Sequence, residues 1–193
     1  MKLYDISREL FTADVYPGDP SPYQELIRRM DVGDGYNLSA FYTGCHCATH
    51  LDAPRHFVED GETIDQVPLE KFCGKCSVVT VGGVITGETV DNLLPVCEKI
   101  ILFRGVGDAY LSQSGAFALA DAGVTLVGTD AKSVGAPGDE YSPHYELLSA
   151  GIPILEGLDF TGVSDGTYFL AAFPLKMRGL EASPCRAILW LPD

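Results

Sequence analysis

The sequence predicts a single layered α/β or α+β domain spanning residues 1–193. Short apolar runs alternate with amphipathic stretches, so strands and helices interleave along the chain. The length of 193 residues fits one domain. Hydrophobic residues make up 46% of the chain and charged residues 21%, which is ordinary for a globular protein with a sizeable core.

Four strands are predicted within the first 103 residues. Residues 36–43 alternate apolar side chains with other side chains, which is the period of a strand. Residues 77–81 are continuously apolar, as in a strand that is buried on both faces. Similar patterns predict strands at residues 2–6 and 100–103, and the glycine-rich joints at 81–83 and 105–107 are interpreted as turns.

Three helices are predicted from the residues at their ends. Thr86 is the N-cap of a helix over residues 86–97, and Gly123 ends a second helix over residues 112–122. Ser142 and Pro143 open a third helix that Gly151 closes. Further strands are predicted at residues 125–127, 152–155, 167–172 and 186–191.

The charge and the N-terminal segment restrict the partners. The net charge of −14 repels phosphate backbones, so we expect no nucleic-acid partner. No apolar run approaches the roughly 20 residues of a membrane helix. Asp5 and Arg8 interrupt the region where a signal peptide needs an apolar stretch. We therefore expect a cytoplasmic protein with no membrane partner.

The six cysteines are interpreted as ordinary thiols. Disulfides are rare in a reducing compartment. Cys73 and Cys76 have the spacing of a redox motif or of half a zinc motif, but no second cysteine pair and no thioredoxin-like context accompany them.

The histidines are concentrated in one short segment. Of the four in the chain, His46, His50 and His56 lie within eleven residues, with Asp52 among them. Their offsets from His46 are all even, so an extended chain would project all four side chains from one face. Pro54 disfavours a helix through the segment. We therefore expect a strand or extended loop.

These residue types indicate a metal site. Neutral imidazole and carboxylate are ligands for zinc, manganese or iron, and two histidines with one aspartate leave the open positions of a catalytic site. Cys45 and Cys47 would face away unless the backbone bends. The zincin pattern HExxH fails because Cys47 replaces its glutamate. The alternative, a cluster of hydrogen-bonded core histidines, explains the density less well.

Two residues of the second half have ordinary interpretations when each is taken alone. His144 lies in the first turn of a predicted helix and fits a surface residue. Glu156 follows an apolar run and fits a charge at a strand end, although a buried carboxylate is costly unless it is paired or bound to a metal.

The segment from His46 to Phe57 closely resembles the signature HxGTHxDxPxHF of the cyclase family, whose best-known enzymes are kynurenine formamidases of the bacterial type. The resemblance covers essentially the whole chain, because further matches lie at residues 16–19, 128–134, 151–158 and 179–187 and at His144 with Leu147 and Leu148. It implies the swivelling β/β/α fold, one or two divalent metals, a small-molecule substrate and a homo-oligomer of at least two subunits. Zinc is the metal expected first, and manganese is the alternative.

The resemblance also implies roles for particular residues. It makes His56 the catalytic histidine and adds two residues to the metal ligands, which become His46, His50, Asp52, His144 and Glu156. Tyr16 stands where kynurenine formamidases commonly carry tryptophan, and we expect it to bind substrate.

Three further departures from the family pattern leave these ligands intact. Ala48 replaces a glycine, which matters only if that backbone has a positive φ. Lys132 replaces a frequent proline, and Leu180, Glu181 and Ala182 replace Ala-Asp-Gly.

Three functions are considered. The first is hydrolysis of N-formylkynurenine to kynurenine and formate in tryptophan catabolism, an arylformamidase activity. The second is hydrolysis of another small amide or of a cyclic imide such as isatin. The third is a non-catalytic metal-binding module. His56, which suits proton transfer, favours the enzymes, and the absence of a GxSxG motif argues against a serine hydrolase.

Aromatic residues near the N-terminus support the oligomer. Tyr4, Phe11, Tyr16 and Tyr23 lie in segments that one small core need not cover, and aromatic residues are enriched at interfaces.

Overall fold

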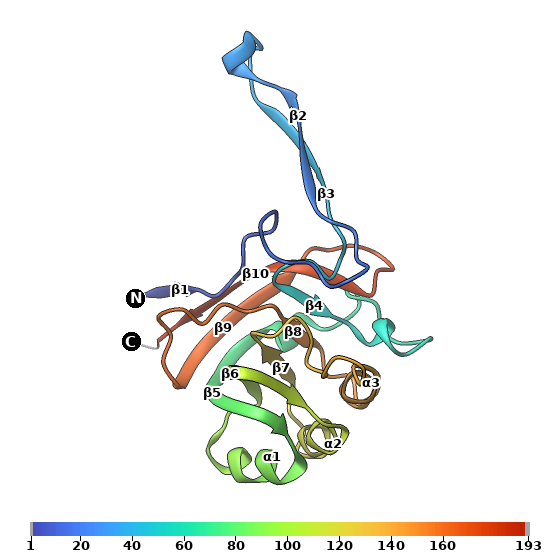
Figure 1. The fold of residues 1–193 in the computed structure, drawn as a ribbon, viewed down its shortest axis with the longest axis vertical. Coiled ribbons are helices and arrows are strands. Elements are labelled where there is room, and N and C mark those ends of the chain that lie inside the picture. The colour runs from blue at the N-terminus through green and yellow to red at the C-terminus, as the bar shows by residue number, and fades with distance from the viewer. Residues whose placement is uncertain (1, 192–193) are drawn as a thin grey trace.

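The computed structural model describes residues 2–191 and confirms the predicted α/β class. Its main sheet has eight strands in the order β1-β10-β4-β8-β7-β6-β5-β9 (Figure 1). The strands are β1 (Leu3–Asp5), β4 (His50–Asp52), β5 (Cys73–Ile85), β6 (Ile100–Leu111), β7 (Leu126–Thr129), β8 (Ile154–Glu156), β9 (Gly166–Pro174) and β10 (Ala182–Trp190). The helices are α1 (Gly87–Leu93), α2 (Gln113–Asp121) and α3 (Tyr141–Ser149).

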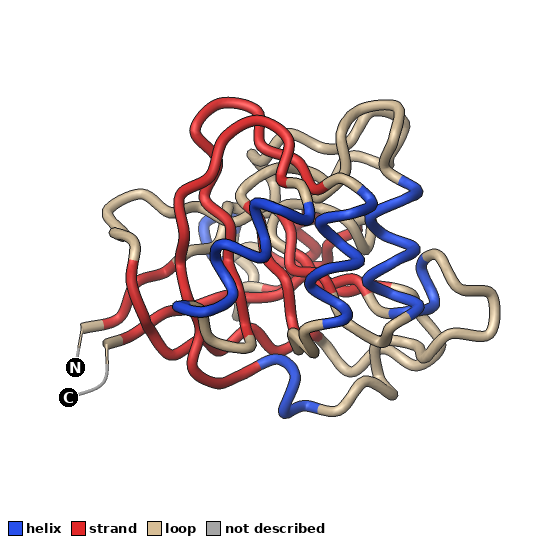
Figure 2. Tube along the Cα trace, turned by 90° about the horizontal axis from the view of Figure 1, so that it is seen from below, coloured by secondary structure: helices blue, strands red, loops and turns tan. Residues whose placement is uncertain are grey.

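The sheet closes on itself, because β9 pairs with both β5 and β10. Residues alternate between two cores on its two faces. Leu102 and Leu155 belong to the inner core, whereas their neighbours Ile101 and Ile154 belong to a second core between the sheet and the helices. Figure 2 shows the three helices lying over this second face.

The two glycine-rich joints are not turns, so that prediction is wrong. β5 and β6 are parallel and continue through both joints, with Val81 opposite Gly105 and a register shift between Val81 and Gly83. Glycines at a bulge let a long strand bend without leaving the sheet. A local glycine pattern cannot distinguish such a bend from a turn.

The helix boundaries agree in part with the prediction. Thr86 caps α1 by accepting a hydrogen bond from the Thr89 N–H at 3.3 Å. α1 ends at Leu93, where Pro95 allows only a short 3₁₀ turn. α3 starts before Ser142, whose hydroxyl donates to Asp139 at 2.7 Å and caps no helix N–H. None of the helices in residues 2–191 is long and apolar enough to cross a membrane.

A long hairpin projects from the body (Figure 1). It consists of β2 (Tyr23–Arg28) and β3 (Leu38–Tyr42), which form a separate two-stranded sheet. β3 agrees with the strand predicted at residues 36–43, whereas β2 was not predicted. Every residue of both strands is exposed, and we call residues 23–42 the arm.

Candidate metal centre

The centre is built on the short strand β4. Leu51 points into the inner core, so its neighbours His50 and Asp52 point to the opposite face. β8 runs antiparallel to β4 and places Glu156 opposite His50. All three polar side chains are almost fully buried.

His46 and His56 reach this centre by turns, which corrects the expectation of an extended segment. Only residues 50–52 form a strand; His46 lies in a turn, and Pro54–His56 form a 3₁₀ turn. The chain therefore folds back at both ends of β4. The rings of His46 and His56 lie 4.1 Å apart between centroids. The even spacing correctly predicted that the side chains of His46 and His56 approach the same centre. They do so because the chain turns at both ends of β4, and not because the whole segment is extended.

Ala48 lies in the bend between His46 and β4 and has a φ of +56°. The glycine of the family signature is therefore replaced at a position where its conformational freedom matters. The bend packs tightly on β8: a Cβ on Gly157 would lie 2.2 Å from the Ala48 carbonyl oxygen. The Thr49 hydroxyl donates to the Gly157 carbonyl at 2.6 Å.

We expect Ala48→Gly to stabilise the protein by about 0.5–1 kcal/mol, because alanine at positive φ is strained by more than glycine costs in unfolded-state entropy. Denaturant midpoints at a fixed metal concentration measure the effect. Ala122→Gly is the matched control, because Ala122 has a φ of −72° and should show no gain. A lower midpoint for Ala48→Gly would contradict the strain argument.

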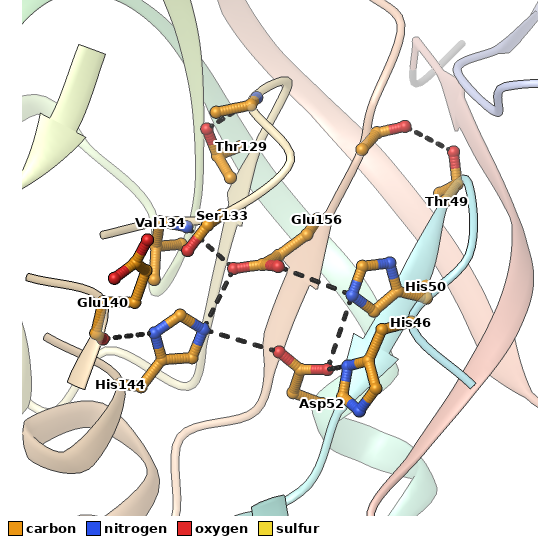
Figure 3. A network of polar contacts seen from close by, with 12 residues as sticks. His46, Thr49, His50, Asp52, Thr129, Ser133, Val134, Glu140, His144 and Glu156 are labelled. Atoms are coloured by element: carbon orange, nitrogen blue, oxygen red, sulfur yellow. Dashed lines mark hydrogen bonds and ion pairs between the residues drawn. The ribbon is translucent and has the colours of Figure 1, made fainter. Parts of the chain in front are cut away.

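The polar atoms converge on a small volume (Figure 3). Asp52 Oδ1 lies 2.9 Å from His46 Nδ1 and 3.5 Å from His50 Nε2. Glu156 Oε2 lies 3.4 Å from His50 Nε2, and Glu156 Oε1 lies 3.2 Å from His144 Nε2. His144, which is buried on α3, also lies 3.8 Å from Asp52 Oδ2. The structure thus gathers residues from both halves of the chain.

Backbone carbonyls orient two of the imidazoles. His50 Nδ1 lies 3.1 Å from the Ala48 carbonyl oxygen, and His144 Nδ1 lies 2.7 Å from the Glu140 carbonyl oxygen. Each Nδ1–H can donate to its carbonyl, which leaves Nε2 as a free lone pair directed at the carboxylates. The Val134 N–H donates to Glu156 Oε1 at 2.8 Å and holds that carboxylate.

The donor set fits a divalent cation. Within residues 2–191, His50 Nε2 and both carboxylate oxygens of Asp52 are buried without a hydrogen bond of good geometry, although His46 Nδ1 lies 2.9 Å from Asp52 Oδ1 as an ion-pair partner. Buried polar atoms left in this way are costly, and in native proteins they signal a missing partner. Imidazole nitrogen and carboxylate oxygen are ligands of zinc and manganese.

The ionisation states of the side chains in the centre also favour binding of a divalent cation. Burial opposes ionisation of Asp52, yet His46 and His50 hold the pKa of its carboxyl below the usual range. Burial alone would lower the pKa of His46, but the carboxylates of Asp52 and Glu181 outweigh it and raise that pKa to about 9. Burial lowers the pKa of His56. The centre therefore carries ionised carboxylates that attract positive charge.

Two groups of three side chains are each close enough together to hold a metal ion, and the two groups share one residue. His50, Asp52 and Glu156 form one set, and His46, Asp52 and His56 form the other. Asp52 belongs to both sets, so it would be a shared ligand if each set held a cation. The backbone does bend around Cys47, but its thiol contacts the Leu10 carbonyl oxygen at 3.6 Å, and neither set includes a cysteine.

The sequence prediction missed Glu181. Its Oε1 lies 3.4 Å from His46 Nε2. Glu181 immediately precedes β10, whose first residue pairs with Asp52. In the sequence, residues 180–182 depart from the family pattern, but this departure gave no indication that Glu181 contacts His46.

A cavity of about 240 Å³ opens onto His46 and His50. Tyr16 and Lys132 line it, and both also line a neighbouring cavity of about 470 Å³. The Tyr16 hydroxyl donates to Glu140 Oε1 at 2.6 Å. The position predicted to bind substrate thus lies at the entrance to the centre.

Residues 4–136 match the family described as putative cyclase. The chain is 38% identical over 206 residues to a kynurenine formamidase of Salinibacter ruber, covering 98% of this chain and 97% of that protein. It therefore belongs to the cyclase family, as the signature predicted.

Two solved structures are also similar. One is described as a potential metal-dependent hydrolase with cyclase activity; it is 29% identical, has a TM-score of 0.81, and the match covers 100% of this chain and 98% of that one. Isatin hydrolase A from Labrenzia aggregata is 19% identical with a TM-score of 0.83, covering 100% and 94%, and shares the fold. Within its family the chain is a metal-dependent hydrolase, as predicted from the sequence.

Proposed function

We propose that the chain is an arylformamidase that hydrolyses N-formylkynurenine to kynurenine and formate. The main support is the buried cluster of imidazoles and carboxylates, in which His50 Nε2 and the Asp52 carboxylate make no hydrogen bond of good geometry within residues 2–191, in a chain 38% identical to a kynurenine formamidase. Proposed ligands are His46, His50, Asp52, His144 and Glu156, binding zinc or alternatively manganese. We also propose that residues 1–193 form one domain and act in the cytoplasm.

A divalent cation at this centre would lower the pKa of a bound water and stabilise the charge that develops on the substrate oxygen. The protein groups supply the rest. His56 lies beside His46 and 5.8 Å from His144 between ring centroids, and we assign its imidazole the transfer of a proton to the leaving nitrogen. Phe57 stacks on His144 at 4.7 Å between ring centroids and covers one face of that imidazole.

The test is a comparison of catalytic efficiencies for the metal-loaded protein. We expect N-formylkynurenine to be hydrolysed in preference to isatin and to alkyl formamides, because an aryl amine is the better leaving group. Turnover of isatin without turnover of N-formylkynurenine would replace this proposal with the cyclic-imide hydrolase, whose fold this chain shares. Hydrolysis of neither would favour the non-catalytic module.

Tyr16 is proposed to bind the aromatic ring of the substrate. Tyr16→Phe keeps the ring but loses the hydroxyl that bonds Glu140, whereas Tyr16→Ala loses both. We expect the alanine variant to raise KM about 10-fold and the phenylalanine variant to change it little. Equal impairment of both variants would instead assign Tyr16 a positioning role through Glu140, whose carbonyl oxygen contacts His144.

We also propose that the protein is at least a dimer. Of the aromatic residues expected at an interface, Tyr4 does not fit, because it packs edge-on against Tyr168 in the core. Tyr23, in contrast, is 59% exposed and stacks only on Tyr42 of the same arm among the described aromatic rings.

A further inference from the structure

Two cavities meet at the entrance to the metal centre. The smaller one, of about 240 Å³, is lined by His46 and His50, whereas the larger one, of about 470 Å³, is lined by neither histidine. Four residues line both cavities, and these are Tyr16, Asp130, Ala131 and Lys132. A substrate whose reacting group lies at the centre therefore has room to extend past Tyr16 into the larger cavity.

The loop that carries Lys132 is fixed relative to the centre. The Ala131 carbonyl oxygen accepts a hydrogen bond from the Gly157 N–H at 3.0 Å, and Gly157 directly follows Glu156. Two residues beyond Lys132, the Val134 N–H donates to Glu156 Oε1 at 2.8 Å. The backbone of Lys132 is thus held beside the centre from both sides, which is the support that a specific substrate contact needs.

The Lys132 side chain is available to a ligand. Its Nζ lies 3.6 Å from Asp14 Oδ2, and the side chains of Lys132 and Asp14 are 52% and 88% exposed. An ion pair this exposed is weak, because water screens both charges and two mobile side chains must be held in place. A substrate carboxylate that is partly shielded from water in the cavity can therefore replace Asp14 as the partner of the Lys132 ammonium.

The larger cavity is lined by charges of both signs. Among the described residues of its lining, one is a cation, Lys132, and three are acids, Asp108, Asp130 and Glu140. A ligand that carries only a negative charge is attracted by Lys132 but repelled by the excess of carboxylates. A ligand with a carboxylate and an ammonium close together escapes this net repulsion, so the lining favours a zwitterion.

One of the three acids is free to bind the ammonium of such a ligand. Asp130 Oδ1 accepts from the Gly105 N–H at 2.9 Å, and Glu140 Oε1 accepts from the Tyr16 hydroxyl at 2.6 Å. Asp108 is exposed on β6, and within residues 2–191 its side chain makes no hydrogen bond or ion pair. Asp130 and Glu140 therefore serve the protein, whereas Asp108 has its full charge to offer a ligand.

We propose that the larger cavity binds the amino-acid end of the substrate, with the Lys132 ammonium against its carboxylate and the Asp108 carboxylate against its ammonium. This proposal rests on the proposed function, because N-formylkynurenine is an aryl formamide whose ring carries an α-amino acid on a short acyl chain. With the formamide at the centre and the ring on Tyr16, the acyl chain enters the larger cavity, which Tyr16 also lines. The proline that is frequent in the family at position 132 offers no such charge.

Calorimetric binding to the metal-loaded protein tests the proposal without turnover. The probes are kynurenine and 2-aminoacetophenone, which has the same ring and carbonyl group but no amino acid. We expect the wild type to prefer kynurenine by about 100-fold, because each of two contacts to a charged group contributes about 10-fold. Lys132→Gln and Asp108→Asn should each lower this preference about 10-fold, whereas Lys132→Arg keeps the charge and should retain most of it.

Two further variants are controls. Lys75→Gln is the matched control, because Lys75 is exposed on β5 and lines neither cavity, and it should leave the preference unchanged. Arg8→Gln tests the other nearby cation, which lines only the smaller of the two cavities and donates to the Asp130 carbonyl oxygen at 3.0 Å. If Arg8→Gln lowers the preference and Lys132→Gln does not, the carboxylate lies in the smaller cavity and the proposal is wrong.

Turnover of two aryl formamides, N-formylkynurenine and N-formyl-2-aminoacetophenone, decides the proposed function separately. A protein that hydrolyses them but binds kynurenine and 2-aminoacetophenone equally well would remain an arylformamidase, and the proposed role of the larger cavity would be overturned. A protein that hydrolyses neither formamide, yet prefers kynurenine in a way that depends on Lys132, would overturn the proposed function and support binding of a zwitterion in the larger cavity.

Discussion

His50→Ala is expected to lose the bound metal together with the hydrolase activity. The imidazole lies between the two buried carboxylates, with Nε2 3.5 Å from Asp52 and 3.4 Å from Glu156. Outer partners of metal ligands contribute up to about 100-fold in affinity, so removal of a central ligand should cost at least that much. Elemental analysis after dialysis at a defined free zinc concentration measures the loss.

Leu51→Ala is the control for this variant. Leu51 is fully buried in the same strand but points into the opposite core, so its truncation should cost about 2–5 kcal/mol in stability and leave the metal in place. A His50→Ala protein that keeps stoichiometric metal would remove His50 from the ligand set. Loss of metal from both variants would attribute the effect to destabilised β4.

His56→Ala is expected to keep most of its metal and to lose at least about 100-fold in turnover, the scale of a general acid or base. His56 stands at the end of a 3₁₀ turn rather than on β4, and its ring contacts His46 and Phe57. Added imidazole should restore part of the activity, because the truncated side chain leaves space for it.

The structure makes this experiment decisive, because His56 also belongs to a set of ligand atoms with His46 and Asp52. Metal content separates the two roles. If His56→Ala loses about half of the bound metal along with its activity, His56 is a ligand of a second cation. If the metal content is unchanged and activity falls, His56 carries the proton.

The sequence indicated which residues lie close together better than it indicated the geometry that brings them together. The cluster of histidines around Asp52 could be found by spacing alone, because His50 and Asp52 lie two residues apart on a strand and share a face. His144 and Glu156 required the family resemblance, since the pairing of β8 with β4 joins residues about a hundred positions apart in sequence. No local pattern reports such a pairing.

Strand β2 of the arm and the glycine-rich bends were missed for a related reason. β2 carries Glu25 and Arg28 among its apolar residues and has no buried face, so no alternation marks it as a strand. Gly83 and Gly105 look like turn residues locally, but the long parallel pairing of β5 with β6 overrides that tendency. Glu181 depends on the register of β10, which is also a long-range property.

The position of β4 in the sheet determines when the centre can be assembled during synthesis. Both backbone neighbours of β4 come late in the chain: β8 ends at Glu156, and β10 begins at Ala182. During translation, the arm and His50 leave the ribosome long before β8 and β10, the two strands that pair with β4, have been synthesised. The nascent chain must therefore hold apolar arm residues in solution while β4 remains unpaired, which is the condition under which chains aggregate or require chaperones.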